Sequence, residues 1–296
     1  NWEIYWYFME HRIIRRNQMA YIDLHFHSIY SDGTYTPEEL LYYAKKKELS
    51  AVSLTDHDTI KGLERARKQS EKLGIKFING VEINSCCYVS NRLVNIHVLG
   101  YNFVIEKMNE YMKMLKALRD EHNDAIIRAL RRIGICIDYA DVEKQAEECI
   151  LTRMNFARTL VKKGYASTEG EALAKYLHKG GSAYVECSYP LFSVVSQKIH
   201  EAGGIVSLAH PAEYGLNDNQ TEILIKNLMD YGLEAIEVIH PSQDTIYSKK
   251  LQDIATKNNL AFTGGSDFHG SNDNGVDLGL GGENMMIPDS ILANLF

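Results

Sequence analysis

The sequence predicts an α/β protein with a barrel of seven strands, one unit short of the common eight, and a helical insertion. Two observations predict the barrel. Strand-like apolar runs alternate with helix-like segments. Seven of the runs also end in histidine or carboxylate residues, and strand ends of a barrel converge on one mouth. The third observation is a central stretch of about 85 residues where the strand-like runs stop, which predicts the insertion.

The first half of the barrel is predicted to contain four strands, beginning with a strand at Tyr21–His27. A helix should follow from Thr36 to Lys47, since Thr36-Pro37-Glu38-Glu39 forms a capping box with proline at the first helical position. A second helix should end at Gly74, a residue typical of helix C-termini. The remaining strands are expected at residues 51–55, 76–83 and 93–101, and the second helix at residues 60–73.

The insertion is predicted to be helical because Met108, Met112, Leu115 and Leu118 follow helical spacing. Residues 107–163 hold 12 Lys and Arg against 9 Asp and Glu, a local charge of +3 in a chain of charge −7. This excess has two interpretations of about equal weight. It is either a solvated helical face or a lid that attracts an anionic substrate.

The α/β alternation resumes after Pro190, with a helix to Ala202 and the stop Gly203-Gly204. Three further strands are expected at residues 205–209, 233–239 and 260–264. The predicted organisation is an N-terminal extension at 1–18, a barrel domain at 19–105 and 191–296, and a helical subdomain at 106–190.

Composition narrows the class of protein. A net charge of −7 over 296 residues argues against a surface that holds long nucleic acid. No apolar stretch approaches the roughly 20 residues that span a bilayer, and the first 18 residues lack the order of a signal peptide. Five cysteines without C-x-x-C spacing indicate a reducing compartment. We therefore expect a cytoplasmic protein without a membrane partner. Its oligomeric state is left open.

The residues at the predicted strand ends are of the types that bind divalent metals. His25 and His27 lie two apart on a strand, so both face one side and can hold one ion. His240 also follows a strand, but a substrate-contacting or supporting role fits it equally well. His11, His122, His178 and His200 are assigned to the surface or core. The predicted ligands are His25, His27, Asp32, His57, Glu82, His97, His210, Asp267 and His269.

These motifs resemble the polymerase and histidinol phosphatase (PHP) family of phosphoesterases. D-L-H-x-H-S-x-x-S-D-G, T-D-H-D, G-V-E, A-H-P and G-S-D-x-H occur in family order within residues 21–101 and 193–269. The resemblance implies a distorted (β/α)7 barrel and two or three divalent ions, of Mn, Fe or Zn. One ion would be held by His25, His27, Glu82 and Asp267. Glu82 would bridge to a second ion on His97 and His210, whose assignments could be exchanged, and Asp32, His57 and His269 would hold a third.

A metal site of this kind predicts hydrolysis of a phosphate ester, because paired divalent ions generate hydroxide from a bridging water and neutralise phosphoryl charge. Asp267 is the candidate for orienting that water, and Glu82 and His210 complete the predicted catalytic set. Asp56 and Asp58 are expected to fix imidazole tautomers. Nucleophilic catalysis by a side chain has less support, since no G-x-S-x-G or Cys-His signature occurs.

The segment Thr152–Arg158 resembles the R-x-H-x-A-R segment of the nucleotide-acting subgroup of the family. Arg153 would then clamp a phosphate. Asn155 stands where the subgroup commonly has histidine, and with Arg153 and His240 it completes the predicted substrate contacts, while Arg158 is read as structural. The favoured substrate is a small phosphorylated nucleotide, either a 3',5'-nucleoside bisphosphate or an oligonucleotide end. The alternatives are a cyclic phosphodiester, histidinol phosphate, and a regulatory module without turnover.

Overall fold

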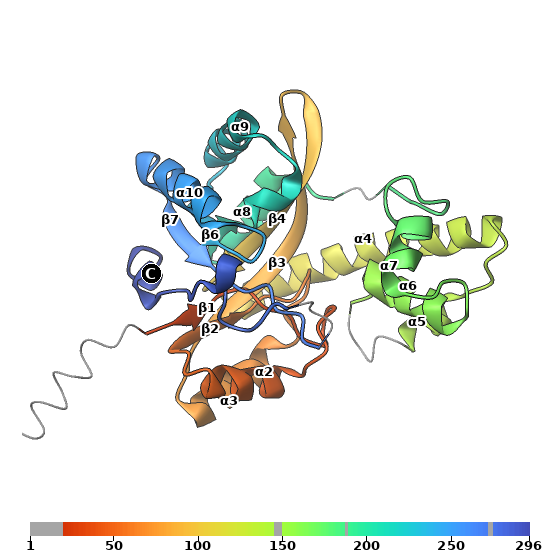
Figure 1. The fold of residues 1–296 in the computed structure, drawn as a ribbon, viewed down its shortest axis with the longest axis horizontal. Coiled ribbons are helices and arrows are strands. Elements are labelled where there is room, and N and C mark those ends of the chain that lie inside the picture. The colour runs from red at the N-terminus through yellow and green to blue at the C-terminus, as the bar shows by residue number, and fades with distance from the viewer. Residues whose placement is uncertain (1–19, 145–149, 187–188, 272–274) are drawn as a thin grey trace, which may run out of the picture.

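The structure, a computed structural model, describes residues 20–144, 150–186, 189–271 and 275–296. Its centre is a seven-stranded sheet in which the strands follow chain order from β1 to β7. The sheet curls into a nearly closed barrel, and a group of helices projects from one side of it (Figure 1). This confirms the predicted α/β barrel with seven strands. The predicted N-terminal extension lies outside the described residues.

The strands are short except for the third and fourth. β1 pairs with β2 and β2 with β3 in parallel, and the pairs β5–β6 and β6–β7 are parallel as well. Their bounds are β1 (Ile22–Asp23), β2 (Ala51–Leu54), β3 (Lys76–Val89), β4 (Arg92–Tyr101), β5 (Ile205–Leu208), β6 (Ala235–Ile239) and β7 (Ala261–Gly264).

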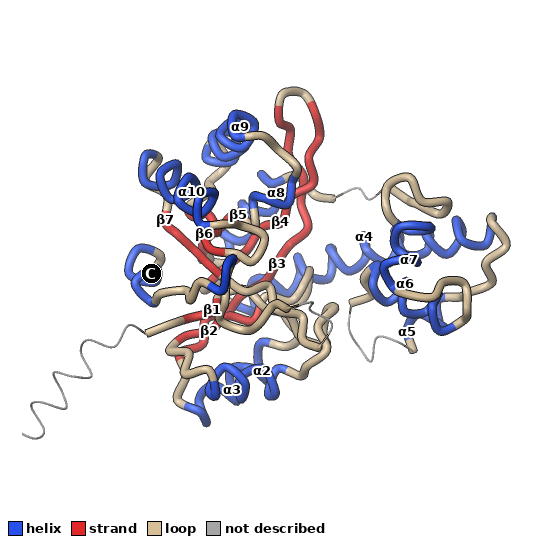
Figure 2. The backbone as a smooth tube through the Cα atoms, viewed as in Figure 1, coloured by secondary structure: helices blue, strands red, loops and turns tan. Residues whose placement is uncertain are grey.

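Alternating strands and helices are typical of a parallel sheet, but β4 departs from this pattern and is antiparallel to both of its neighbours. β3 and β4 form one long hairpin that rises above the rest of the sheet (Figure 2). Ser90 and Asn91 turn the chain with φ of 48° and 64°, the left-handed conformation that tight two-residue hairpins require. No crossover helix is needed for such a connection. His97 therefore lies in the middle of a strand and not at its end.

Helices cover the outside of the barrel (Figure 1). The predicted capping box forms, with Thr36 and Glu39 bonded to each other's backbone N–H groups. The second helix ends, as predicted, at Gly74, whose φ is 66°. The covering helices are α2 (Pro37–Lys46), α3 (Leu63–Leu73), α8 (Phe192–Glu201), α9 (Asp218–Met229) and α10 (Thr245–Lys257). Short 3₁₀ helices occur at Pro211–Tyr214, Gly282–Asn284 and Asp289–Asn294.

Backbone contacts between the segments that follow β1 and β7 bring the ends of the sheet together. The N–H of Leu24 donates to the Gly264 carbonyl over 3.1 Å, and the N–H of Asp267 donates to the His25 carbonyl over 2.7 Å. Gly265 permits this approach, because a Cβ atom there would lie 2.1 Å from the His25 Cβ. The closure places predicted ligands from the two ends of the chain side by side.

The insertion consists of α4 (Ile105–Arg132), α5 (Tyr139–Glu143), α6 (Arg153–Lys162) and α7 (Glu169–Ala172), which continues into a π-helical turn at Leu173–Leu177. The start of α4 packs into the barrel core through Met108 and Leu115, whereas its end packs with Phe156 in a second core. α4 thus joins the two bodies. None of the described helices is long and apolar enough to cross a bilayer.

Candidate metal centre

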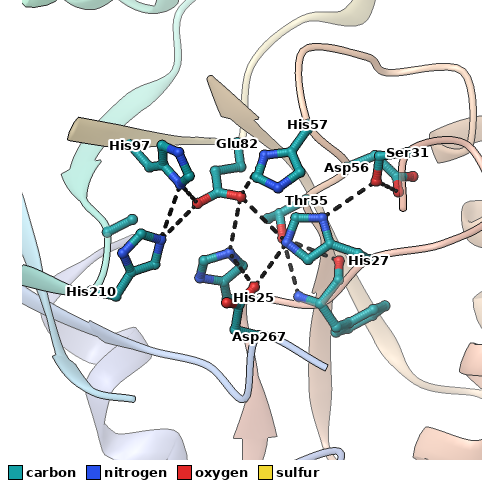
Figure 3. A network of polar contacts seen from close by, with 12 residues as sticks. His25, His27, Ser31, Thr55, Asp56, His57, Glu82, His97, His210 and Asp267 are labelled. Carbon is teal, nitrogen blue, oxygen red and sulfur yellow. Dashed lines mark hydrogen bonds and ion pairs between the residues drawn. The ribbon is translucent and has the colours of Figure 1, made fainter. Parts of the chain in front are cut away.

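Most of the predicted ligands lie around Glu82, namely His25, His27, His57, His97, His210 and Asp267 (Figure 3). Glu82 lies on β3, and His97 faces it from β4. The others lie beyond the ends of strands. His25 and His27 follow β1, His57 follows β2, His210 follows β5, and Asp267 and His269 follow β7.

The first group of ligands is His25, His27, Glu82 and Asp267. Oδ1 of Asp267 lies 3.2 Å from Nε2 of His25 and 3.0 Å from Nε2 of His27. Oε2 of Glu82 lies 3.4 and 3.3 Å from the same two nitrogens. Ligands on a tetrahedral ion with bonds near 2.1 Å are about 3.4 Å apart. The two imidazole nitrogens and Oε2 of Glu82 are buried, and none of their close contacts has the geometry of a hydrogen bond, so this group fits a divalent ion.

The second group uses the other oxygen of the same carboxylate. Oε1 of Glu82 lies 2.8 Å from Nδ1 of His97 and 2.9 Å from Nε2 of His210, and the two nitrogens are 3.2 Å apart. Glu82 therefore presents one oxygen to each group, as the bridging role requires. His57 also reaches Glu82, with Nδ1 2.9 Å from Oε2.

The third group joins His27 to Asp32, His57 and His269. Nε2 of His269 lies 3.3 Å from Oδ1 of Asp32, and Nε2 of His57 lies 3.6 Å from Oδ2. Oδ1 of Asp32 is buried and has no hydrogen-bond partner. The second of these contacts is longer than any in the first two groups, and the residues are donors of the kind that divalent transition metals prefer.

Charges within the cluster are strongly interdependent. Burial opposes ionisation of Glu82 and Asp267, but the surrounding imidazoles outweigh burial and hold the pKa of both carboxyls well below its usual range. Burial also disfavours protonated His57, yet the carboxylates of Glu82 and Asp32 raise its pKa to about 9. Burial, with help from the imidazoles of His269 and His57, lowers the pKa of His27 to about 4. Without metal, the cluster thus favours ionised carboxylates and a protonated His57, whereas His27 stays neutral at pH 7.

Comparison with known proteins decides the family. The model of the PHP domain matches residues 23–176. The chain belongs to the PHP family. A Haemophilus influenzae protein named 5'-3' exoribonuclease is 34% identical over 83% of this chain and 89% of its own length. A 3',5'-nucleoside bisphosphate phosphatase of Chromobacterium violaceum is 33% identical over 88% of this chain and 91% of its own.

A solved structure agrees with the assignment. A protein from Bifidobacterium adolescentis, assigned as a metal-dependent phosphoesterase, superposes with a TM-score of 0.79 and 28% identity over 93% of this chain and 94% of its own. This PHP protein is accordingly a metal-dependent phosphoesterase, and the expected enzyme class is confirmed.

The PHP cluster contains one acidic residue that sequence reasoning missed, Glu237 on β6. Its side chain is fully buried, with Oε1 3.0 Å from Nδ1 of His25, and Oε2 accepts from the backbone N–H of His210 over 2.7 Å. Glu237 orients a ligand of the first group and the backbone of a ligand of the second. Its sequence signal is the single charge within the apolar run Ala235–Ile239. His240 follows the same strand, and its Nε2 lies 3.5 Å from Oδ2 of Asp267.

The expected contact of Asp56 and Asp58 with imidazoles is wrong. Asp56 accepts from the backbone and hydroxyl of Ser28, each over 2.7 Å, and from the Ser31 hydroxyl over 2.7 Å. Asp58 binds the backbone and amide of Asn84. Asp56 therefore ties the loop of His57 to the loop that follows β1, and it reaches an imidazole only through Ser31, whose hydroxyl lies 3.4 Å from Nδ1 of His27. Asp58 ties the same loop to β3.

A pocket joins the PHP metal ligands to the insertion. Asp32, His57 and His97 line the barrel side, and α4 and α6 supply basic residues opposite them. The full lining is Asp32, His57, Asp58, Asn84, His97, Leu115, Leu118, Arg119, His122, Asn123, Thr152, Arg153, Tyr189 and Pro190. The pocket thus places cationic groups within one cavity with the predicted metal ligands, as an anionic substrate requires.

Two sequence-based assignments change at this pocket. His122 was read as a surface or core residue, but it lines the pocket with a buried, unbonded Nε2. Burial, with Arg153 and Arg119 nearby, lowers its pKa to about 4, so the ring is neutral at pH 7. Asn155 is not among the lining residues. Its buried side chain accepts from the N–H of Thr152 over 2.7 Å, which places it in the helix cap.

The other histidines differ in what the structure says of them. His200 lies at the surface, as expected, and pairs with Glu234 over 2.9 Å. Burial and the nearby charge of Arg153 lower the pKa of His178. His11 lies outside the described residues.

The raised pKa of His57 makes the metal-free protein pH-dependent. We expect its free energy of unfolding to fall as pH rises from 6.5 to above 9, by at most about 3 kcal/mol from this residue. The sign follows because the pKa of His57 is about 9 in the folded state and near 6.5 in the unfolded state. The folded protein therefore binds the proton more tightly, and this stabilisation is lost when His57 is deprotonated at high pH. Urea unfolding of chelated protein across that range measures the slope. A His57→Gln variant with an undiminished slope would contradict the assignment.

Proposed function

We propose that this PHP phosphoesterase hydrolyses a phosphate ester of a small nucleotide, with a 3',5'-nucleoside bisphosphate or the end of a short oligonucleotide as substrate. The observation that carries the proposal is that Arg153 lines the same pocket as the predicted metal ligands Asp32, His57 and His97. One phosphate of the substrate would lie at the ligands and the other at the arginine. The related bisphosphatase, 33% identical, supports the same class.

Arg153 is suited to hold the second phosphate. It is the first residue of α6, is only partly buried, and has no hydrogen-bond or ion-pair partner within the described part of the chain. A guanidinium can donate two parallel hydrogen bonds to a phosphate, and a helix N-terminus favours negative charge. Neutral His122, with its unbonded Nε2 in the same pocket, can donate a further hydrogen bond.

The residues present fit two or three divalent ions, which we assign to Mn, Fe or Zn from the mixture of imidazole and carboxylate. Such ions, when bound, lower the pKa of water and neutralise charge on phosphoryl oxygens. We assign to Asp267 the orientation of the attacking water, because it contacts both His25 and His27 and 23% of its side chain remains exposed. We assign Glu82 and His210, whose side chains are 2.9 Å apart, to the same catalytic set as metal ligands.

A substrate panel tests the proposal. Protein reconstituted separately with Mn, Fe and Zn would be assayed on nucleoside monophosphates, 3',5'-bisphosphates, cyclic phosphates, 5'-phosphorylated oligoribonucleotides and histidinol phosphate. We expect the highest kcat/KM for a substrate with two phosphates. A clear preference for cyclic phosphates would replace the proposal by cyclic phosphodiester hydrolysis, and absence of turnover on the whole panel would favour a regulatory module.

A second candidate is stepwise cleavage from the 5' end of RNA. It is favoured by the 34% identity to a protein named 5'-3' exoribonuclease. The net charge of −7 disfavours binding along a lengthy strand, but it does not oppose binding of a single end in a locally basic pocket. Release of mononucleotides from a 5'-phosphorylated oligonucleotide, with efficiency exceeding that on free bisphosphates, would favour this candidate.

A further inference from the structure

The insertion contacts the barrel beside the ligands of the third metal group. The N–H of Ile150 donates to the Tyr30 carbonyl over 3.1 Å, two residues before Asp32. The guanidinium of Arg158 reaches the carbonyl of Asp32 itself over 3.4 Å. Arg119 of α4 forms an ion pair with Asp58, which follows His57. Two of the four third-group ligands thus lie on loops that the insertion holds.

The contact at Asp58 is the most constrained of these. The Asp58 side chain is 6% exposed and that of Arg119 is 16% exposed. The carboxylate accepts from the backbone N–H and the amide of Asn84, each over 3.0 Å, and the Asp58 backbone N–H donates to the Glu82 carbonyl over 2.8 Å. The residue has φ of 51°, a conformation uncommon for aspartate that the surrounding bonds must maintain.

Arg119 is the cation at this buried carboxylate. Without it Asp58 would keep only neutral hydrogen-bond donors, and an uncompensated buried charge is strongly unfavourable. The loop would then relax toward solvent, and His57 would move with it. The first and second ligand groups should be less affected by the loss of Arg119. Glu82 and His97 lie on paired strands, and a backbone hydrogen bond joins Asp267 to His25.

We propose that the helical insertion positions the ligands of the third metal group, with Arg119 acting on the loop of His57 and Arg158 on the loop of Asp32. The inference rests on the third ion of the proposed function. It makes occupancy of that ion dependent on the insertion, so the element that lines the substrate pocket also completes the metal site. Arg119 and Arg158 are positioning residues in this arrangement.

Metal binding by variants tests the inference directly. Mn²⁺ titration followed by electron paramagnetic resonance would compare wild type, Arg119→Ala, Arg119→Lys, Arg158→Ala and Asp32→Ala, with Arg128→Ala as a matched control at an exposed position on the same helix. We expect Arg119→Ala to lower the affinity for one ion by about tenfold or more, while the other ions bind as in wild type. Asp32→Ala should lose the same ion, and Arg119→Lys should recover part of its affinity because the charge returns.

The outcomes separate the inference from its rivals. Unchanged metal binding in Arg119→Ala together with a raised KM would make Arg119 a substrate contact and overturn the inference. Equal weakening of all ions together with a lowered Tm would show a purely structural role, and this also overturns it. If wild type and Asp32→Ala bind the same ions, the third position of the proposed function fails first, and the inference falls with it.

Discussion

Replacing Glu82 by alanine should abolish turnover and lower the number of divalent ions bound per chain. Glu82 is 1% exposed and offers one carboxylate oxygen to each of two ligand groups. Its loss therefore affects two ion positions at once. Changes to residues that only support metal ligands cost about 10- to 100-fold, so we expect a loss above about 10² in kcat/KM. His25→Ala should act in the same direction through the first group.

Metal analysis and steady-state kinetics on the same samples check this expectation. Wild type should hold at least about two ions per chain, as hydrolysis at a paired site requires. Glu64→Ala, at a glutamate that is 75% exposed on α3, is the matched control and should keep both metal content and activity. Full activity in exhaustively chelated wild-type protein would end the metal-dependent interpretation of this cluster.

Nucleoside 3',5'-bisphosphates should exceed the matching monophosphates in kcat/KM by on the order of 10² or more. A second phosphate held by Arg153 would supply binding energy remote from the reacting phosphorus, and that energy positions the reacting group. A monophosphate lacks this contact. Arg153 lines the same pocket as Asp32, His57 and His97, so both ends of such a substrate have a partner.

The arginine itself provides the discriminating variant. Arg153→Ala should raise KM more than it lowers kcat, with a loss of roughly 2 to 4 kcal/mol in transition-state binding, and should shrink the gap between bisphosphate and monophosphate. Arg153→Lys should rescue poorly because it lacks the planar fork. Arg128→Ala is expected to leave the gap intact. Equal kcat/KM for the two substrates in wild type would refute the two-phosphate model.

Much of the barrel could be predicted because its signals are local. The capping box at Thr36, the stop at Gly74 and the apolar runs of the strands depend on a few neighbouring residues. The orientation of β4 could not be predicted in this way. An apolar strand reads the same in both directions, and only the turn at Ser90 and Asn91 sets its direction. The predicted seven-strand barrel was nevertheless confirmed, because the sheet order is the same for either direction.

The site residues also separate into those that local sequence patterns predict and those that depend on tertiary contacts. The side chains predicted as metal ligands lie together because strand ends meet at the mouth of a barrel. Glu237 was missed because a single acidic residue in an apolar strand carries no motif. His122 was misplaced because helical spacing alone does not tell which face of α4 meets the barrel. Asn155 followed a family motif, but its position at the start of α6 directs the side chain to the cap.

The sequence by itself determined the family and the seven-strand barrel, and it predicted the ligand residues of the candidate metal centre, because each depends on residue types and spacings along the chain. Tertiary structure alone decided which acids contact which imidazoles, and which basic residues face them across the pocket. Those contacts join residues such as Asp58 and Arg119, 61 positions apart in the sequence. Their pairing depends on how α4 crosses from one core to the other, and no local pattern encodes that crossing.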